Sequence, residues 1–342
     1  MQREDFYKFV ETYLPGVLPE ELADRQVKVQ FIDKVLKKPY MGLSLMSPSE
    51  FEAISPTFNL DDFYESFGDL EEMDCLMKIS DFVSKEMAKP FPFQTDNVMN
   101  LLKDYDYAKD HLFVAAVPKV AKDTLNDGNY VDHNGIAAVA KIYVDMPNVD
   151  RNGSITVSNQ MLDTWNKSFE EVYADALISS RNVLQPTINT LESILTAKAG
   201  VEFPEPMPVL TRIYCVSNER LLFGASNLFI PGMLDEISEK VGGSFYIIPS
   251  SIHEVLVAQV DELGGLNQES IRGLEDMIQI VNDTEVSEDE ILSYDLYLYD
   301  SKNKELGLAK EMEKNLKNDH KDLNENLSEE EALGSEDKSK AI

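Results

Sequence analysis

The sequence has little cysteine and few basic residues compared with acidic ones, and each shortage excludes a class of protein. Its 342 residues include two cysteines, Cys75 and Cys215. One chain therefore cannot build a disulfide framework or a four-thiolate zinc site, and this usage suits a reducing cytoplasm. Lysine and arginine number 31 against 62 aspartate and glutamate residues, which gives a net charge of −31. Because binding to a phosphate backbone depends on cationic side chains, we expect no direct nucleic-acid binding.

Long apolar runs and phosphate-binding motifs are also missing from the sequence. No stretch approaches the ~20 apolar residues that cross a bilayer, and residues 1–7 show no basic region followed by an apolar segment. We therefore expect a cytoplasmic protein without membrane association. Neither Gly242-Gly243 nor Gly264-Gly265 belongs to a nucleotide-binding glycine pattern, and no cofactor is predicted.

The beginning of the chain alternates helical and strand-like patterns. Residues 2–13 repeat apolar side chains at i, i+3, i+4 and i+7, which predicts a helix. Residues 26–36 and 41–45 alternate polar and apolar side chains, which predicts a hairpin with one buried face. The two prolines in residues 89–93 predict a boundary, so that residues 1–89 form an N-terminal helical and hairpin subdomain.

Beyond residue 90, strand-like runs occur in groups separated by helical segments. The predicted strands are 111–117, 136–144, 154–158, 210–216, 221–229, 244–248, 254–260 and 294–299, and the predicted helices are 169–182, 233–241 and 268–281. Grouped strands favour an α+β fold with mixed, largely antiparallel sheets packed against helices. We therefore predict a core domain over 90–300. Residues 301–342 are rich in charged and polar residues, which predicts a disordered acidic and polar tail.

Two segments carry a family resemblance. The residues concerned are the run 154–162 with Trp165, Glu170-Glu171, Ala174, Ala176, Asn182 and Pro186, and then Pro249-Ser250-Ser251-Ile252-His253-Glu254-Val255. These segments resemble an uncharacterised protein family of Gram-positive gut bacteria that is often found near mobile elements. The similarity extends over roughly residues 1–300 and leaves the tail outside it. The resemblance implies a bacterial cytoplasm and a mobile-element setting, and it brings no mechanism with it.

The segment from Ser250 to Glu254 is the most suggestive group of chemically active side chains, because it offers two hydroxyls, an imidazole and a carboxylate. Side chains alternate along a strand, so Ser251 and His253 could share a face while His253 and Glu254 would not. The alternative interpretation is a turn whose hydroxyls satisfy backbone groups. A binding site here would comprise Ser250, Ser251, His253, Glu254, Asn159, Asn182 and Asn218.

The sequence matches two metal-binding motifs in part, and each match lacks a residue that the motif requires as a metal ligand. His253-Glu254 begins like a zinc-binding helix, but Val257 stands where the second histidine is required. Residues 148–159 imitate a calcium loop, but Asn159 stands where the motif needs a bidentate glutamate. An Asx-rich hairpin turn is the better interpretation, and no metal site is predicted.

Acidic residues concentrate late in the chain. Residues 261–300 contain twelve acids and one base, Arg272. One interpretation is a solvated surface that maintains solubility, and the other is an anionic face that binds a basic partner or imitates the DNA backbone. The predicted acidic face comprises Asp261, Glu262, Glu269, Glu275, Asp276, Asp283, Glu285, Glu288, Asp289 and Glu290.

The charge and the absence of a complete catalytic motif favour a non-enzymatic interaction protein. Its partner would be a basic protein, and its role that of a mobile-element accessory or anti-defence factor. The alternative is a hydrolase or a small-ligand-binding domain centred on residues 250–254. A third possibility is self-association through apolar residues of the N-terminal helices, and the sequence leaves the oligomeric state open.

Overall fold

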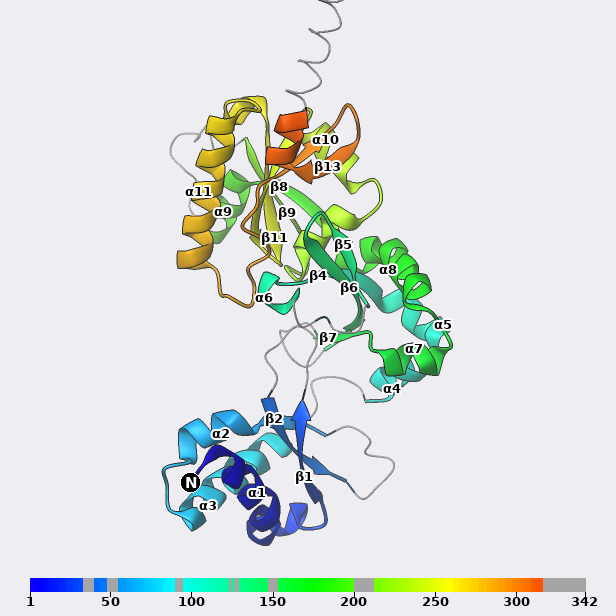
Figure 1. The fold of residues 1–342 in the computed structure, drawn as a ribbon. Helices are drawn as coiled ribbons and strands as arrows, with labels where there is room; N and C mark the ends of the chain where they lie inside the picture. Colours follow the sequence, from blue (N-terminus) through cyan, green and yellow to red (C-terminus); the bar gives the residue numbers. More distant parts are fainter. Residues whose placement is uncertain are drawn as a thin grey trace, which may run out of the picture. The chain divides into compact units, whose positions relative to one another are not determined.

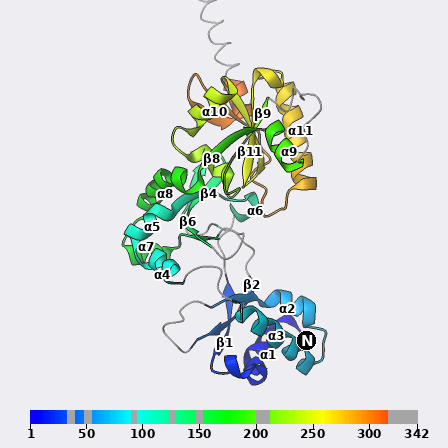
Figure 2. The ribbon, with the colours of Figure 1, turned by 180° about the vertical axis from the view of Figure 1, so that it is seen from behind.

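A computed structural model describes residues 1–32, 40–47, 55–89, 95–122, 125, 129–146, 153–199 and 212–315. The chain forms two compact units, the first from Met1–Lys103 and Val144–Gly153, the second from Asp104–Tyr143 and Ser154–Ile342. Both units combine helices with antiparallel sheets, so the fold is α+β, as predicted (Figures 1 and 2). The prolines of the predicted boundary, at positions 90 and 92, lie outside the described residues. The tail predicted over 301–342 starts too early, because Glu305–Leu308 form a strand and residues 309–315 a helix, and residues 316–342 lie outside the described residues.

The first unit is a small helical and hairpin structure. Its elements are α1 Arg3–Tyr13, η1 Leu14–Val17, η2 Glu20–Leu22, β1 Gln26–Ile32, β2 Tyr40–Met46, β3 Thr57–Asn59, α2 Leu60–Phe67, α3 Glu72–Met87 and α4 Thr95–Lys103. Strand β2 pairs antiparallel with both β1 and β3, which confirms the predicted hairpin. Phe6 and Val10 of α1 pack with Leu43, Leu60 and Ile79 in its core, which confirms the predicted first helix.

The second unit begins with a small sheet. Its first elements are α5 Tyr105–Ala108, η3 Lys109–His111, β4 Leu112–Ala116, α6 Lys119–Lys122, β5 Val131–His133, β6 Ile136–Val144, β7 Gly153–Thr156, α7 Asn159–Trp165, α8 Phe169–Leu184, β8 Pro186–Thr190 and α9 Leu191–Ala199. Strands β4, β5 and β7 all pair with β6. Helix α8 packs on β4, where the Ser180 Oγ accepts a hydrogen bond from the Val114 N–H at 2.9 Å.

The rest of this unit forms a larger antiparallel sheet. The elements are β9 Ile213–Asn218, η4 Gly224–Phe229, α10 Met233–Val241, β10 Phe245–Ser251, β11 Glu254–Gln259, η5 Asp261–Leu263, α11 Gln268–Glu285, β12 Tyr297–Asp300, β13 Glu305–Leu308 and a helix over 309–315. The six-stranded sheet has the order β13-β12-β10-β11-β9-β8. In the described part of the chain, no helix has the length and hydropathy that a membrane span requires.

Helices cover both faces of the six-stranded sheet (Figures 1 and 2). Tyr246 of β10 pairs with Leu298 of β12, and both belong to the core cluster that contains Ile271 and Ile278 of α11. The next residue on each strand points to the opposite face, where Tyr299 donates from its hydroxyl to Asp235 of α10 at 2.7 Å. The sheet therefore lies between α11 and α10.

The strand predicted over residues 221–229 is wrong. Leu221 and Phe223 have φ angles of 51° and 53°, which belong to the left-handed region and interrupt an extended strand. The buried 3₁₀ helix η4 follows directly. Strand β9 pairs with β11 on one side and with β8, at Pro186–Thr190, on the other, and β8 is not among the predicted strands.

Candidate functional site

The segment from Ser250 to Glu254 forms the tip of the hairpin between β10 and β11. Ser251 pairs with Glu254, so Ile252 and His253 make a two-residue turn, and the register shifts at Ser250. The Ser251 Oγ accepts a hydrogen bond from the His253 backbone N–H at 3.0 Å. This hydroxyl therefore satisfies a backbone donor, as serine commonly does in turns.

The His253 imidazole is held by the backbone of a neighbouring segment. Its Nδ1 accepts a hydrogen bond from the Phe223 N–H at 3.2 Å, so the neutral ring carries its proton on Nε2. That Nε2 lies 3.6 Å from Oε1 of Glu290, while Glu254 accepts a hydrogen bond from the Cys215 thiol at 3.5 Å. In the described part of the chain, no serine hydroxyl is hydrogen bonded to the imidazole. A nucleophilic serine and its histidine base need such a hydrogen bond. The contacts of Ser251 and His253 therefore favour a structural role for both side chains.

The end of β9 is tied to this hairpin. The buried Asn218 accepts through Oδ1 from two backbone N–H groups of the following loop. Ser217 donates from Oγ to the His253 carbonyl at 2.8 Å. Gly224 lies so close to both segments that a Cβ at this position would be 2.3 Å from the His253 carbonyl oxygen and 2.5 Å from the Ser217 Oγ. The hairpin tip and the loop after β9 are therefore tightly packed.

Two of the predicted binding residues do not join the hairpin. Asn159 is exposed at the start of α7, where its Oδ1 accepts a hydrogen bond from Nδ2 of Asn129 at 2.5 Å. Asn182 is exposed on α8. Among the residues that the structure describes, neither side chain is hydrogen bonded to the turn at 250–254. Asn218 is the predicted asparagine that lies next to this turn, at the end of β9 beside Ser217, whose hydroxyl donates to the turn.

Two partly or fully buried cationic side chains, Lys141 and Arg220, are not among the predicted site residues. Lys141 of β6 is 6% exposed, donates from Nζ to the Thr156 Oγ1 at 2.8 Å, and lies 5.1 Å from the centre of the Phe223 ring. The half-buried Arg220 donates from Nη1 to the Tyr143 hydroxyl at 2.7 Å. A signal for Lys141 was present, because it is the one charged residue within the apolar strand 136–144.

His133 is a second histidine with an unusual environment. Its ring stacks on Phe229 with 4.3 Å between the ring centres, and its Nε2 lies 2.9 Å from the Tyr173 hydroxyl oxygen. Burial lowers the pKa of His133, and the neighbouring Asp132 carboxylate partly opposes this effect. Burial also raises the pKa of the Tyr173 hydroxyl. The folded protein therefore favours the neutral imidazole.

We expect the free energy of unfolding to decrease as the pH falls below about 6.5. In the unfolded chain His133 titrates near its ordinary pKa of 6.5, whereas its folded pKa is lower, so the unfolded state takes up the proton first. The loss of stability continues until the pH reaches the folded pKa. Urea denaturation at pH 7 and at about pH 5.5 measures this change. The His133→Gln variant should lose less stability than the parent protein, and equal losses would contradict the assignment.

Helix α11 is anchored to the six-stranded sheet by one face. Ile271 and Ile278 are 2% and 1% exposed and belong to the core cluster with Tyr246 and Leu298. Asn282 is buried on the same face and donates from Nδ2 to a backbone carbonyl at 3.0 Å. These positions follow helical spacing, so the opposite face of α11 points away from the sheet.

The outer face of α11 combines acidic and apolar side chains. Three of the exposed acids of α11 recur every seven residues and follow one row along the helix: Glu269, Asp276 and Asp283. The exposed Arg272 lies between the first two on the same side, and within the described ranges it forms no ion pair with them. Beside this row lies an apolar stripe, made of Met277, Ile280 and Val281, which are 41%, 63% and 38% exposed. We refer to the three acids of the row and the three apolar residues of the stripe as the α11 outer face.

Some members of the predicted acidic face are already paired. Glu262 forms an ion pair with Arg212, and Glu275 forms one with Lys310 at 2.6 Å. Asp283 accepts a hydrogen bond from the Tyr294 hydroxyl at 3.0 Å. Within the described ranges, no ion pair neutralises the exposed carboxylates of Asp261, Glu269, Asp276, Asp283, Glu285, Glu288 and Asp289. These carboxylates are available to a partner.

Comparison with known proteins gives a family without an assigned activity. The chain matches the family described as "Family of unknown function (DUF5688)" over residues 3–301, which confirms the resemblance to an uncharacterised family. No curated protein and no solved structure matches the chain.

Among the described residues, no three histidine, cysteine, aspartate or glutamate side chains form a group that could hold a metal ion. Residues 148–152 of the calcium-like segment lie outside the described residues.

Proposed function

The chain belongs to DUF5688, a family of unknown function, and we propose that it is a non-enzymatic protein that binds a basic protein segment through the α11 outer face. The observation that carries this proposal is the row of unneutralised carboxylates beside an exposed apolar stripe. Solubility accounts for surface charge, but it does not account for apolar side chains exposed beside that charge. A partner that presents lysine or arginine beside apolar side chains would complement both parts of the face.

The geometry favours a basic amphipathic helix as the partner segment. On an α-helix, acids seven residues apart are separated by ~10.5 Å along the axis. Phosphates along one DNA strand are separated by ~3.4 Å along its axis, so this row is about three times too sparse to imitate every phosphate. A helix with basic residues at the same seven-residue period would match the row, and its apolar side chains would cover Met277 and Ile280.

The finer role that we propose is that of a mobile-element accessory or anti-defence factor. It rests on the resemblance of residues 154–186 and 249–255 to proteins found near mobile elements. In that role, the α11 outer face would occupy a basic helix on a host protein and prevent the host protein from using it. The charge of the chain would accelerate the encounter at low salt.

The alternative function, a hydrolase or ligand-binding domain at residues 250–254, has less support from the contacts. The Ser251 hydroxyl accepts from a backbone N–H, and the His253 Nδ1 accepts from another. Both groups therefore serve the hairpin tip in this structure.

The proposal predicts salt-sensitive binding of a defined basic helix to the full chain. The probe is a fluorescently labelled amphipathic peptide of lysine and leucine, with lysines at a seven-residue period. The variant Glu269→Gln/Asp276→Asn/Asp283→Asn should bind it about tenfold more weakly, because exposed charge pairs contribute ~0.2–1 kcal/mol each. Ile280→Ser should also weaken binding, because it removes apolar contact area. Fluorescence anisotropy at about 50 mM and about 300 mM salt measures both effects.

A matched variant separates this surface from the general charge of the chain. Glu20, Asp24 and Asp69 are exposed acids of the first unit. The variant Glu20→Gln/Asp24→Asn/Asp69→Asn removes the same number of charges and should change peptide affinity less than twofold. Equal losses in the two triple variants would overturn the proposal, as would full affinity in the α11 variant.

A further inference from the structure

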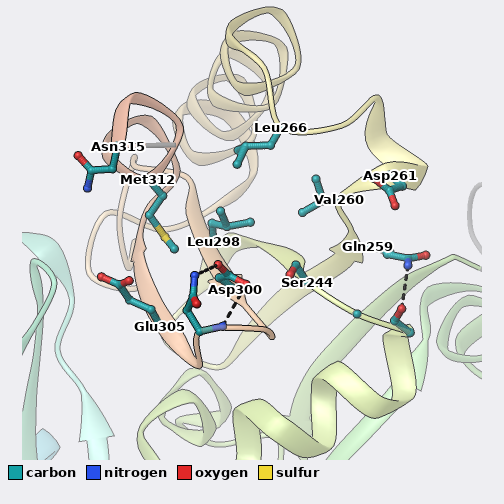
Figure 3. Close-up of a pocket in the computed structure, with 13 residues that line it drawn as sticks. Ser244, Gln259, Val260, Asp261, Leu266, Leu298, Asp300, Glu305, Met312 and Asn315 are labelled. Carbon is teal, nitrogen blue, oxygen red and sulfur yellow. Dashed lines mark hydrogen bonds between the residues drawn. The ribbon is translucent and has the colours of Figure 1, made fainter. Parts of the chain in front are cut away.

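A cavity of about 460 Å³ lies at one end of strands β10 to β13 in the second unit (Figure 3). Residues 242–244 just before β10, the ends of β11 and β12 and the start of β13 all contribute to its lining. Asp261 of η5, Leu266 and the helix over 309–315 complete its walls. Small-molecule sites in proteins have volumes of ~300–1,000 Å³, so this cavity has the size of a ligand site.

Part of the cavity wall is apolar. The apolar lining residues are Val260, Leu266, Leu298 and Met312. Figure 3 shows these side chains directed toward the same central space, although they come from four different segments. Leu298 is 2% exposed and belongs to the core cluster behind the cavity, so this part of the wall is firmly held. The wall offers contact area to a hydrocarbon chain.

The polar part of the wall carries negative charge. Its three carboxylates are Asp261, Asp300 and Glu305, and the described lining residues include no lysine or arginine. Asp300 is held by hydrogen bonds from the backbone N–H groups of Lys302 and Asn303 and from the Asn303 Nδ2. Asp261 and Glu305 are exposed, and Figure 3 shows them on opposite sides of the cavity. Within the described ranges, neither of these two forms an ion pair.

We propose that this cavity binds an aliphatic diamine or polyamine. The hydrocarbon chain lies against Leu298 and Met312, and the two ammonium ends meet the carboxylates of Asp261 and Glu305. Anionic ligands are disfavoured, because the described lining has no cation to neutralise them. A neutral hydrocarbon would cover the apolar wall but would leave the carboxylates without a partner as it displaces their water. This site is independent of the α11 outer face.

Isothermal titration calorimetry of the full chain tests the proposal. The probes are 1,8-diaminooctane and spermidine, with 1,8-octanediol as the uncharged counterpart of the same length. We expect saturable one-to-one binding of both amines and at least tenfold weaker binding of the diol. The variant Asp261→Asn/Glu305→Gln should weaken binding of 1,8-diaminooctane at least tenfold.

A control variant removes the same charge from another surface of the second unit. Asp163→Asn/Glu170→Gln changes two exposed acids that do not line the cavity and lie outside the α11 outer face, and it should change amine affinity less than twofold. Met312→Ser should reduce the affinity for 1,8-diaminooctane more than the affinity for the shorter 1,4-diaminobutane, because the longer chain covers more of the wall. The proposal is overturned by equal losses in the two double variants, by equal binding of the diol, or by binding that never saturates at one amine per chain.

Discussion

Replacing Gly224 with alanine should destabilise the second unit by about 3 kcal/mol, because the new methyl group would overlap packed atoms on two sides. An alanine Cβ would lie 2.3 Å from the His253 carbonyl oxygen and 2.5 Å from the Ser217 Oγ. One of these atoms is backbone, and the other is held by its own hydrogen bond to that backbone. Relief would therefore require movement of the hairpin tip or of η4. Urea denaturation followed by circular dichroism measures the loss.

Gly273→Ala provides the matched control for this prediction. Gly273 lies within α11, and a Cβ there would have no heavy atom within 4 Å beyond its immediate chain neighbours and helix backbone. Alanine is favoured over glycine in a helix by ~0.5–1 kcal/mol, so this variant should be slightly more stable than the parent. Equal stability of Gly224→Ala and Gly273→Ala would mean that the hairpin tip and η4 are not closely packed around Gly224.

A large difference in the free energy of unfolding is also expected between variants of two isoleucines of α11 that lie two residues apart. Ile278→Asp should destabilise the protein by about 4 kcal/mol or more, because it removes a buried apolar side chain and places a carboxylate against the core. Ile278 is 1% exposed, whereas Ile280 is 63% exposed. Ile280→Asp should cost less than about 1 kcal/mol, as exposed substitutions usually do.

The same pair of variants tests which face of α11 is available to a partner. Chemical denaturation of Ile278→Asp and Ile280→Asp, together with peptide binding by Ile280→Ser, gives the orientation of the helix independently of any single contact. We expect Ile280→Asp to fold normally, and we expect Ile280→Ser to bind the lysine and leucine peptide more weakly, because it removes apolar contact area without adding a charge. Equal destabilisation by the two variants would mean that the outward direction assigned to Ile280 is wrong.

Local patterns predicted much of the fold. The alternation in residues 26–32 predicts the hairpin, and Val27 is buried as the pattern requires, but Phe31 on the same phase of the pattern is 64% exposed. The region 221–229 was mispredicted because its apolar composition resembles a strand, while its conformation depends on tertiary packing. Its two residues with positive φ, Leu221 and Phe223, donate from their backbone N–H groups to the Asn218 carbonyl and to the His253 Nδ1, and both acceptors lie outside the predicted strand.

The candidate sites were predictable in part. The position of the acidic segment followed from composition, but the pairing of Glu262 with Arg212, 50 residues away in sequence, depends on the sheet. The apolar stripe around Ile280 was hidden because exposed and buried apolar residues look alike in a sequence. The cavity at the ends of β10 to β13 unites segments from Gly242 to Asn315, so no local motif marks it.

The most direct test of the proposed function is site-specific photo-cross-linking to the lysine and leucine peptide. A benzophenone amino acid replaces Ile280 in one protein and Ile178 in another, since both are exposed isoleucines on helices of the second unit, at 63% and 74%. Binding through the α11 outer face predicts that the probe at position 280 cross-links the peptide and that this product disappears at high salt. The probe at position 178 should give little product. Equal cross-linking from the two positions, or none from position 280, would contradict the proposed interaction surface.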